Sequence, residues 1–400
     1  MRIIPVHSKK EEKAFLHFPR KLYLNDPWHV VQFDSEIRNA FDPKINPYFK
    51  HGDAVRWIAV NGKGETVGRI AAFYDRHKDE ADYVRSGGCG FFECIDDREV
   101  AFLLFDTAKA WLEKHGYEAM TGPVNFGEND TNWGCLVQGF MPQALGMTYN
   151  FPYYKELFES YGFKLYYRQL SYHLDIVKPF PERFWKIAEW IHKRDGYTYK
   201  HFDLKKTAEF VEHTTSIYNQ AWSKFKEDFT PMDPSSLYDE LRKIKAIMDP
   251  EMIWFAFHHG EPIAFYMFLP DANQIFRHLN GKLHLINKLR FLNYKRRHTI
   301  TRARGTAAGV VPKFQNSGVE SGIFYELRKV MDRKPQYKEF ELSWVGDFNP
   351  KMISLYINTG AVHAKTHFTY RYLFDRERPY RRFMEESVDE SKLPENVLKL

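Results

Sequence analysis

The chain has 400 residues, of which 44 % are hydrophobic and 28 % charged, and its formal net charge is +6. This composition excludes disordered, collagenous and coiled-coil proteins, and the length predicts two to three domains of about 150 residues each. Because the net charge is small for this length, binding of a polyanion would need a local cluster of basic residues. The sequence has no apolar run long enough to cross a membrane and no signal-peptide core, so we expect a cytoplasmic protein.

The first half of the chain alternates predicted strands and helices. Apolar alternation on both sides of Asn61-Gly62-Lys63-Gly64 predicts a β-hairpin over 56–75. Apolar residues three and four positions apart predict a helix over 98–116, which Gly116 ends. The other expected elements are a short N-terminal strand, a helix ending near Leu24, an irregular loop over 26–51, a strand over 87–97, a strand and loop after 117, a helix over 153–163 and a strand over 164–175.

The second half repeats this order of elements after a linker that contains Pro179 and Pro181. The repeat predicts a duplicated mixed α/β fold with domains 1–177 and 178–375 and a charged tail, 376–400. The expected elements are a strand over 197–204, a helix over 205–222, a hairpin over 252–269, a strand over 301–311, a helix over 317–332, a strand over 338–345, a helix over 349–360 and a closing strand over 364–374.

The segment 310–330 is the strongest candidate for a binding site. A buried strand here runs into a small polar turn and then into an amphipathic helix, with Ser317 and Gly318 at the joint. Unpaired backbone N–H groups and the helix dipole at such a joint bind anions, and glycine lets a phosphate approach closely. The alternative is that Ser317 only caps the helix.

The hexapeptide Gln315-Asn316-Ser317-Gly318-Val319-Glu320 resembles the Q/R-x-x-G-x-G/A loop of the GNAT acyltransferase superfamily, and 341–361 resembles the later strand and helix of that family. The resemblance implies two tandem GNAT-like domains, each a mixed, mostly antiparallel sheet flanked by helices. It implies acetyl-CoA or another acyl-CoA as cosubstrate, with no metal. The implied roles are pantetheine binding by Val310 and Val311, pyrophosphate binding by Gln315, Asn316, Ser317, Gly318 and Val319, cofactor or acceptor binding by Asn349, and protonation of the departing thiolate by Tyr356.

The first half resembles the superfamily in the order of its elements but lacks the site residues. Acidic residues, Asp96 and Asp97, stand where the phosphate loop would be, and Phe158 stands where Tyr356 does in the second half. We therefore expect a degenerate domain that shapes the cleft or binds the acceptor. Its segment 122–140 resembles a poorly characterised group of bacterial tandem GNAT-like proteins. Candidates for lining the acceptor site, or for merely shaping turns, are Asn125, Phe126 and Asn150.

A second departure from the family pattern is Glu320, which stands where the family has Gly or Ala. A carboxylate beside a diphosphate is repulsive, unless it points away along the helix. An acceptor amine must also lose a proton before attack, which calls for a base. Period two on the strand 338–345 puts Glu341 on its polar face, so Glu341 is the candidate base and Asp347 the second choice. The alternative is that Glu341 is a solvated charge.

The segment 282–304 holds eight Lys or Arg residues and no acidic residue. Four apolar residues fall on one helical face: Leu285, Ile286, Leu289 and Leu292. Three interpretations are open: an ordinary core stripe with a solvated basic face, a patch for tRNA or another polyanion, or a membrane-surface helix.

The remaining residue types suggest little other chemistry. The three cysteines, Cys89, Cys94 and Cys135, lack the spacing of zinc sites or disulfide frameworks, and we expect reduced thiols and no metal site. The predicted function is transfer of an acyl group from acyl-CoA to a small-molecule or peptide amine. The alternatives are an aminoacyl-tRNA-dependent transferase and a non-enzymatic ligand-binding or regulatory protein on the same fold.

Overall fold

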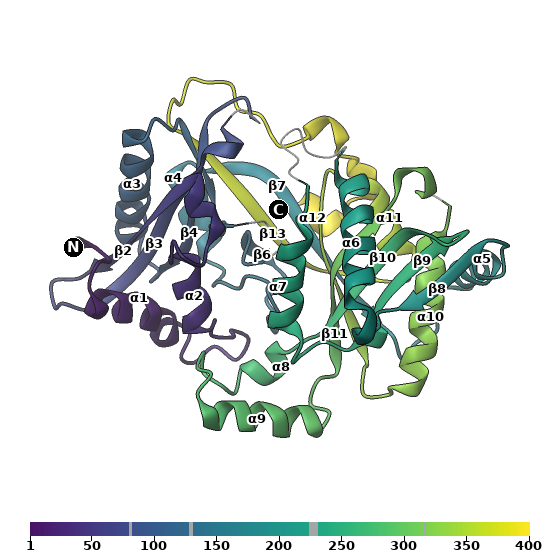
Figure 1. The fold of residues 1–400 in the computed structure, drawn as a ribbon. Coiled ribbons are helices and arrows are strands. Elements are labelled where there is room, and N and C mark those ends of the chain that lie inside the picture. Colours follow the sequence, from purple (N-terminus) through teal and green to yellow (C-terminus); the bar gives the residue numbers. More distant parts are fainter. Residues whose placement is uncertain (80–81, 128–130, 224–230, 316) are drawn as a thin grey trace.

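The computed structural model describes residues 1–79, 82–127, 131–223, 231–315 and 317–400. Within them, thirteen strands form one continuous sheet with helices on both faces (Figure 1). The order of strands is β1-β2-β3-β4-β5-β13-β7-β12-β11-β10-β9-β8, and β6 pairs with β13. The sheet is mixed, because β4 pairs in parallel with β5 and β11 with β12, whereas the other pairs are antiparallel. The expected mixed α/β fold class is confirmed.

The first half builds one end of the sheet. Its elements are β1 (Arg2–Pro5), α1 (Lys9–Leu22), α2 (Asp34–Ala40), β2 (Gly52–Val60), β3 (Thr66–Asp75), β4 (Ser86–Cys94), α3 (Arg98–Lys114), β5 (Ala119–Gly122), β6 (Cys135–Gln138), α4 (Tyr154–Tyr161) and β7 (Lys164–Asp175).

The second half builds the other end. Its elements are α5 (Glu182–His192), β8 (Tyr197–His201), α6 (Thr207–Trp222), α7 (Pro234–Ile244), β9 (Ile253–His258), β10 (Glu261–Pro270), α8 (Asn273–Phe276), α9 (Leu285–Arg296), β11 (Arg302–Val310), α10 (Val319–Arg333), β12 (Glu339–Gly346), α11 (Pro350–Asn358), β13 (Val362–Leu373) and α12 (Glu395–Leu398).

The last strand of each half lies in the sheet of the other half. Strand β7 pairs with β12, for example at Glu341 and His173, and β13 pairs with β5, for example at Tyr372 and Met120. The two exchanged strands also pair with each other over most of their length. One sheet therefore runs through both halves.

Alternation along the strands decides which helices cover which face. In β2, Ile58 packs with Phe15 and Ile37 of α1 and α2, whereas Trp57 packs with the α3 and α4 side. In β9, Phe255 packs with α6, and Trp254 packs on the other face in the core that includes α10 and α5. Each end of the sheet is thus sandwiched between two helical layers.

Four segments differ from the sequence expectations. The loop over 26–51 contains helix α2, and α5 and α7 lie where no helix was expected. The charged tail is packed rather than merely appended, since Val397 is fully buried and Lys155 donates to the carbonyl oxygen of Leu400 at 2.8 Å. The three cysteines are free and buried, as expected, and burial raises the pKa of Cys89 to about 12.

Candidate functional site

Two parallel strands separate in the second half and leave backbone edges open. Strands β11 and β12 pair from Arg302 opposite Glu339 to Gly305 opposite Leu342. Beyond this point β11 continues along β10 to Val310, and β12 continues along β7 to Gly346. Register shifts interrupt β10–β11 at Met267/Phe268 and β12–β7 at Leu342/Val345, next to the point of separation. Bulges of this kind often lie beside active sites, where they re-aim side chains.

The open end of β11 leads into the N-terminus of α10. The N-cap residue is Gly318, in the left-handed conformation at φ 84°, and it offers no side chain to the first turn. The hydroxyl of Ser317 donates instead to the carbonyl oxygen of Phe314 at 2.6 Å. Ser317 therefore does not cap the helix. Among the described residues no side chain makes a capping hydrogen bond there, although Ile187 packs against Gly318, with its Cγ2 3.1 Å from where a Cβ would lie. This leaves polar N–H groups pointing out of a 15-residue helix, which suits an anion.

The other expected cofactor residues lie in the strand and turn before α10, in its first turn, and at the start of α11. The backbone N–H of Val311 donates to the carbonyl oxygen of Ile263 at 2.9 Å, and Gln315 Nε2 donates to that of Val310 at 3.4 Å. Val319 is fully buried and anchors the helix on the core. Asn316 lies outside the described residues. The Asn349 side chain accepts a hydrogen bond from the backbone N–H of Met352 at 3.2 Å, so it caps α11.

One expectation was that Glu320 points away along the helix. In the structure it does not point away from the body of the protein. Its carboxyl is partly buried, and its charge acts on two tyrosines on the sheet side of α10, Tyr199 and Tyr266. Burial raises the pKa of this carboxyl above its ordinary value. The raised pKa lowers the fraction of the side chain that is charged near the helix end, and so weakens its repulsion of a phosphate.

Tyr356 lies at the point where β11 and β12 separate. Its ring is 7 % exposed, and its hydroxyl donates to the carbonyl oxygen of Ser343 at 3.2 Å. Burial raises the pKa of Tyr356, although the nearby Arg304 guanidinium opposes the rise. The phenol is therefore fully protonated at neutral pH, which is the state that a proton donor needs.

Glu341, the candidate base, lies in a buried ionic network. Both of its oxygens accept from the Lys365 ammonium, at 2.7 and 2.6 Å, and Arg302 lies 3.6 Å away. Arg302 in turn pairs with Asp271 at 2.6 Å. Burial by itself raises the pKa of Glu341, but Lys365 and Arg302 overcome it and hold the pKa below its ordinary value. Such a carboxylate is a stable partner for cations and a weak base.

Asp347, the second candidate base, is also paired with cations. It is fully buried, and its Oδ2 lies 3.3 Å from Arg168 and 2.5 Å from Arg382. Sequence reasoning missed these networks because charged residues in strands usually face solvent. A signal was present nonetheless: Arg302 and Arg304 stand two residues apart in an otherwise small and apolar strand.

The first half contains a cavity of ≈ 100 Å³, enclosed by α1, β4, the segment after β5 and the loop 29–32. Asn125 and Asn150 line it, as do Gln143 and Asn132. The amide of Asn150 is pinned by three backbone bonds, two to Leu136 and one to the carbonyl oxygen of Phe151. Phe126 lies outside the lining, in an aromatic cluster with Phe73.

A polar group at one wall of this cavity was not foreseen from the sequence. Glu93 accepts hydrogen bonds from the hydroxyls of Tyr23 and Tyr154, both at 2.7 Å, and Arg69 lies 3.5 Å away. Burial raises the pKa of Glu93, against the lowering by Arg69. His29, stacked on Tyr23 with centroids 3.9 Å apart, has its pKa lowered to about 3 by burial.

The helix end of the first half is closed to an anion. Strands β4 and β5 pair in parallel only from Ser86 to Gly88 and then separate, as β11 and β12 do. Here, however, Asp97 caps α3 by accepting from the backbone N–H groups of Glu99 and Val100, at 2.9 and 3.2 Å. A carboxylate thus occupies the place that a phosphate would need.

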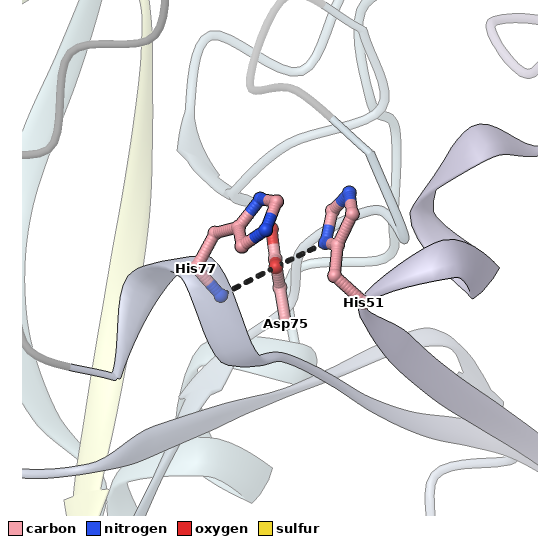
Figure 2. Close-up of side chains that lie close together, drawn as sticks. All are labelled: His51, Asp75 and His77. Carbon is pink, nitrogen blue, oxygen red and sulfur yellow. Dashed lines mark hydrogen bonds and ion pairs between the residues drawn. The ribbon is translucent and has the colours of Figure 1, made fainter.

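His51, Asp75 and His77 bring three ligand-type atoms within 4.8 Å of one another (Figure 2). His51 Nδ1 lies 2.5 Å from Asp75 Oδ1, which also accepts from the backbone N–H of His77 at 3.0 Å. The two imidazole rings stack with centroids 4.0 Å apart. In this arrangement Asp75 caps the turn 76–78 and contacts the His51 ring.

The chain is similar over nearly its whole length to two curated proteins. It is 29 % identical over 378 residues to "Bacterial ceramide synthase" from Caulobacter vibrioides, covering 92 % of this chain and 97 % of that protein. It is 27 % identical over 369 residues to "Protein YghO" from Escherichia coli, covering 91 % of this chain and 93 % of that protein. No family model matches the chain.

Solved structures share its architecture at low identity. A tandem GNAT protein from the clavulanic acid biosynthesis pathway aligns with a TM-score of 0.56 and 11 % identity, covering 95 % of this chain and 99 % of that chain. The GCN5-related N-acetyltransferase from Sphaerobacter thermophilus aligns with a TM-score of 0.50 and 12 % identity, covering 97 % and 98 %. These alignments cover both halves and the shared sheet, so this chain is a protein of the tandem GNAT fold.

Proposed function

We propose that this protein transfers a fatty acyl group from an acyl-CoA to the amine of a long-chain amino alcohol, forming an amide. In this proposal residues 178–375 hold the donor, and residues 1–177 shape the acceptor site. One observation carries it: the open ends of β11 and β12 meet an uncapped helix N-terminus and the buried hydroxyl of Tyr356.

The donor would lie along this opening. The N–H groups at the start of α10 face a diphosphate, and Gly318 lets the diphosphate approach the backbone. The pantetheine arm would extend along the edge of β11 that faces away from β10, near Val310, forming hydrogen bonds like those of an added strand. The N–H of Val311 donates to Ile263 on the β10 side, so Val311 would contribute to the shape of this edge rather than donate to the arm. The thioester then reaches the point of separation, beside Tyr356. Gln315, in the turn before α10, would contact the diphosphate.

The chemistry follows from this placement. The amine nitrogen attacks the thioester carbonyl carbon, a C–N bond forms and the C–S bond breaks. The sulfur takes the proton of the Tyr356 hydroxyl as it leaves, and Tyr356 regains a proton from water. The proton released by the amide nitrogen passes to water, since Glu341 and Asp347 are both held by cations. An amine transferred into an apolar site has a lowered pKa and so enters neutral, which removes the need for a strong base.

Two observations favour an acceptor with a long chain. The similarity to the Caulobacter protein spans both halves, and the name of that protein refers to ceramide, an N-acylated long-chain amino alcohol. The cavity of the first half combines apolar side chains, such as Leu16, Val31 and Ile37, with the amides of Asn125 and Gln143. Such a lining suits an apolar chain with a polar head.

The experiment is an assay of the purified protein in detergent with acyl-CoAs of several chain lengths and a long-chain amino alcohol. Thiol release and the amide product are followed together, the latter by mass spectrometry. We expect Tyr356→Phe to lower kcat by about 10²–10⁴-fold with little change in KM, because only the proton donor is lost. The matched control is Tyr172→Phe. The Tyr172 ring lies 5.5 Å from that of Tyr356, and its hydroxyl has no partner among the described residues.

The proposal is wrong if the wild type forms no amide with any of these acyl-CoAs. The assigned role of Tyr356 is wrong if Tyr356→Phe keeps the wild-type kcat, or if Tyr172→Phe loses as much activity.

A further inference from the structure

Helix α9 is held on the body by one side only. It lies at the periphery of the molecule, at the lower edge of Figure 1. On its inner side, Asn287 Nδ2 donates to the carbonyl oxygens of Leu279 and Lys282, at 2.9 and 2.8 Å. Phe291, 8 % exposed, packs near Phe276 with ring centroids 5.9 Å apart. These two inner residues fix which face of the helix points outward.

The outward face is apolar. Leu285 is 73 % exposed, Ile286 61 %, Leu289 59 % and Leu292 60 %. Positions i, i+1, i+4 and i+7 form one stripe along a helix. The interpretation of this stripe as part of the core is therefore wrong, because the side chains that bury are Asn287 and Phe291. Four large aliphatic side chains in one exposed stripe are unusual on a protein that has no partner there.

Basic residues flank the stripe. Lys288, Arg290 and Arg296 are exposed on α9, and the segment 282–304 has no acidic residue. A helix with an apolar face between cations lies in the boundary between lipid headgroups and acyl chains, where anionic lipids balance its charge.

A second exposed apolar group adjoins this segment. Leu24 is 77 % exposed and Trp28 40 %. Their loop is tied to the α8–α9 region by Arg277, whose Nη2 donates to the carbonyl oxygen of Pro27 at 2.7 Å. Tryptophan is enriched at membrane–water interfaces because its ring is apolar and its N–H polar.

We propose that α9, together with the loop 24–28, docks this protein on a membrane surface rich in anionic phospholipid. Charge complementarity and the aliphatic stripe favour this partner over an RNA, which binds through cations and stacking aromatic rings and makes no use of four leucine-type side chains. A second copy of the chain would bring the flanking cations of the two helices together. Within the described residues no helix is long and apolar enough to cross a membrane, so contact through this face would be peripheral.

The docked helix adjoins the wall of the cavity in the first half. Gly281, in the turn that leads into α9, accepts a hydrogen bond from the backbone N–H of Asp34 at 3.2 Å. A Cβ on Gly281 would lie 2.7 Å from the carbonyl oxygen of Gln32 and from Val31. Val31 and Gln32 both line the cavity. Docking on α9 would therefore bring the cavity wall close to the lipid surface, but docking itself does not depend on the proposed acylation.

The test is flotation of the full chain with vesicles of phosphatidylcholine, with and without phosphatidylglycerol, at low and high salt. We expect the protein to float with the anionic vesicles and to be released by salt. Leu285→Gln/Leu289→Gln should weaken this binding at least tenfold, and Lys288→Gln/Arg296→Gln about fivefold per charge removed. Glycerol phosphate in solution should not compete, since it offers the headgroup without the acyl chains.

The matched control is Leu204→Gln/Leu398→Gln, at residues that are 49 % and 42 % exposed on other elements, and it should bind as the wild type does. All these positions are at the surface, so the variants should fold, which circular dichroism checks. The proposal is overturned if the wild type stays in the soluble fraction with anionic vesicles at low salt, or if the leucine variant floats like the wild type. A third outcome is that the protein does not float but binds RNA, and that this binding is lost in the Lys288/Arg296 variant and kept in the leucine variant. That result would assign the surface to a polyanion instead.

The assay in detergent with the long-chain amino alcohol separates this result from the proposed function, because it contains no vesicles. A variant that no longer floats with vesicles but keeps full activity in detergent has lost only the membrane contact of α9. Flotation without any acylation would contradict the proposed function and leave the docking surface intact.

Discussion

At the N-terminus of α10, the Glu320 carboxyl decides how tightly an anion binds. Glu320 is partly buried with a raised pKa, so its charged form is less stable in the folded protein than in the unfolded chain. Its contribution to stability is present below the unfolded pKa and is lost as the pH rises through the folded pKa. Each pKa unit of such a shift corresponds to about 1.4 kcal/mol.

Glu320→Gln should therefore be more stable than the wild type at neutral pH, and the difference should vanish in acid. It should also bind CoA several-fold more tightly, because it removes a charge beside the diphosphate. Urea denaturation from pH 4 to 8 and calorimetric titration with CoA measure the two effects. Equal stability at all pH values would mean that the carboxyl is solvated.

His29 links the cavity to acid stability. Its pKa is lowered to about 3 by burial, so the folded protein holds it neutral. The stabilising contribution is present above the unfolded pKa of 6.5 and is lost as the pH falls toward 3. His29→Phe keeps the stacking on Tyr23 and removes the titration. Between pH 6.5 and 4.5 the wild type should lose about 2 kcal/mol more stability than the variant.

Urea unfolding at several pH values gives this difference directly. The buried His367, whose pKa is lowered to about 4, titrates in both proteins and cancels in the comparison. Parallel pH profiles for the two proteins would place the His29 ring in solvent and would contradict the burial described above.

At the scale of elements, a buried ion pair joins β12 to β13. Lys365→Met should cost about 3–5 kcal/mol, because it leaves the Glu341 carboxylate buried without the cation that both of its oxygens contact. Glu341→Gln leaves the Lys365 ammonium buried in the same way. The double variant should cost much less than the sum of the two single variants, and a double-mutant cycle in urea measures the coupling. Additive costs would show that the pair contributes no coupling.

The Glu341→Gln protein also tests the hypothesis that Glu341 is a base. If Glu341 takes the amine proton, the rate falls and the shape of the pH–rate profile changes in the folded variant. If it only pairs with Lys365, the variant loses stability and keeps its profile. We expect the second result, since both carboxylate oxygens already accept from Lys365.

Much of the order of elements was predictable from local signals, although helices α2, α5 and α7 were not expected. Turn residues at 61–64 and the apolar spacing over 98–116 predicted the β2–β3 hairpin and α3, and both are confirmed. Which face of α9 points outward was not predictable, because a stripe of leucines on a helix has the same spacing whether it packs on the core or contacts lipid. The exchange of β7 and β13 was equally hidden, since strand pairing between distant segments leaves no local trace.

Part of the candidate site was predictable as well. The turn before α10 follows from its glycine, whereas the ionic network around Glu341 depends on residues from four separate segments, among them Asp271 and Lys365. Charged residues in strands give no sign of burial until their partners are known. The cavity of the first half was equally hard to predict, because its walls come from segments far apart in the sequence, from Leu16 to Tyr154.

At the scale of the whole molecule, the exchanged strands make the two halves interdependent. A fragment 1–177 lacks β12 and β13, so β5 loses its antiparallel partner and both edges of β7 are left unpaired. We expect the full chain to unfold in one cooperative transition and each fragment alone, 1–177 or 178–400, to be unfolded or aggregated. Calorimetry on the full chain and circular dichroism on the fragments check this. A monomeric 1–177 fragment with cooperative unfolding would contradict it.

The central claim is that the second half, and not the first, holds an acyl-CoA. The most direct test is calorimetric titration of a non-hydrolysable acyl-CoA thioether into the wild type and two matched variants. Ser317→Trp places an indole before α10, and Asp96→Trp places one at the exposed equivalent position before α3. We predict one site in the wild type, binding at least tenfold weaker in Ser317→Trp and unchanged binding in Asp96→Trp. Unchanged binding in Ser317→Trp, or loss in Asp96→Trp alone, would contradict the claim.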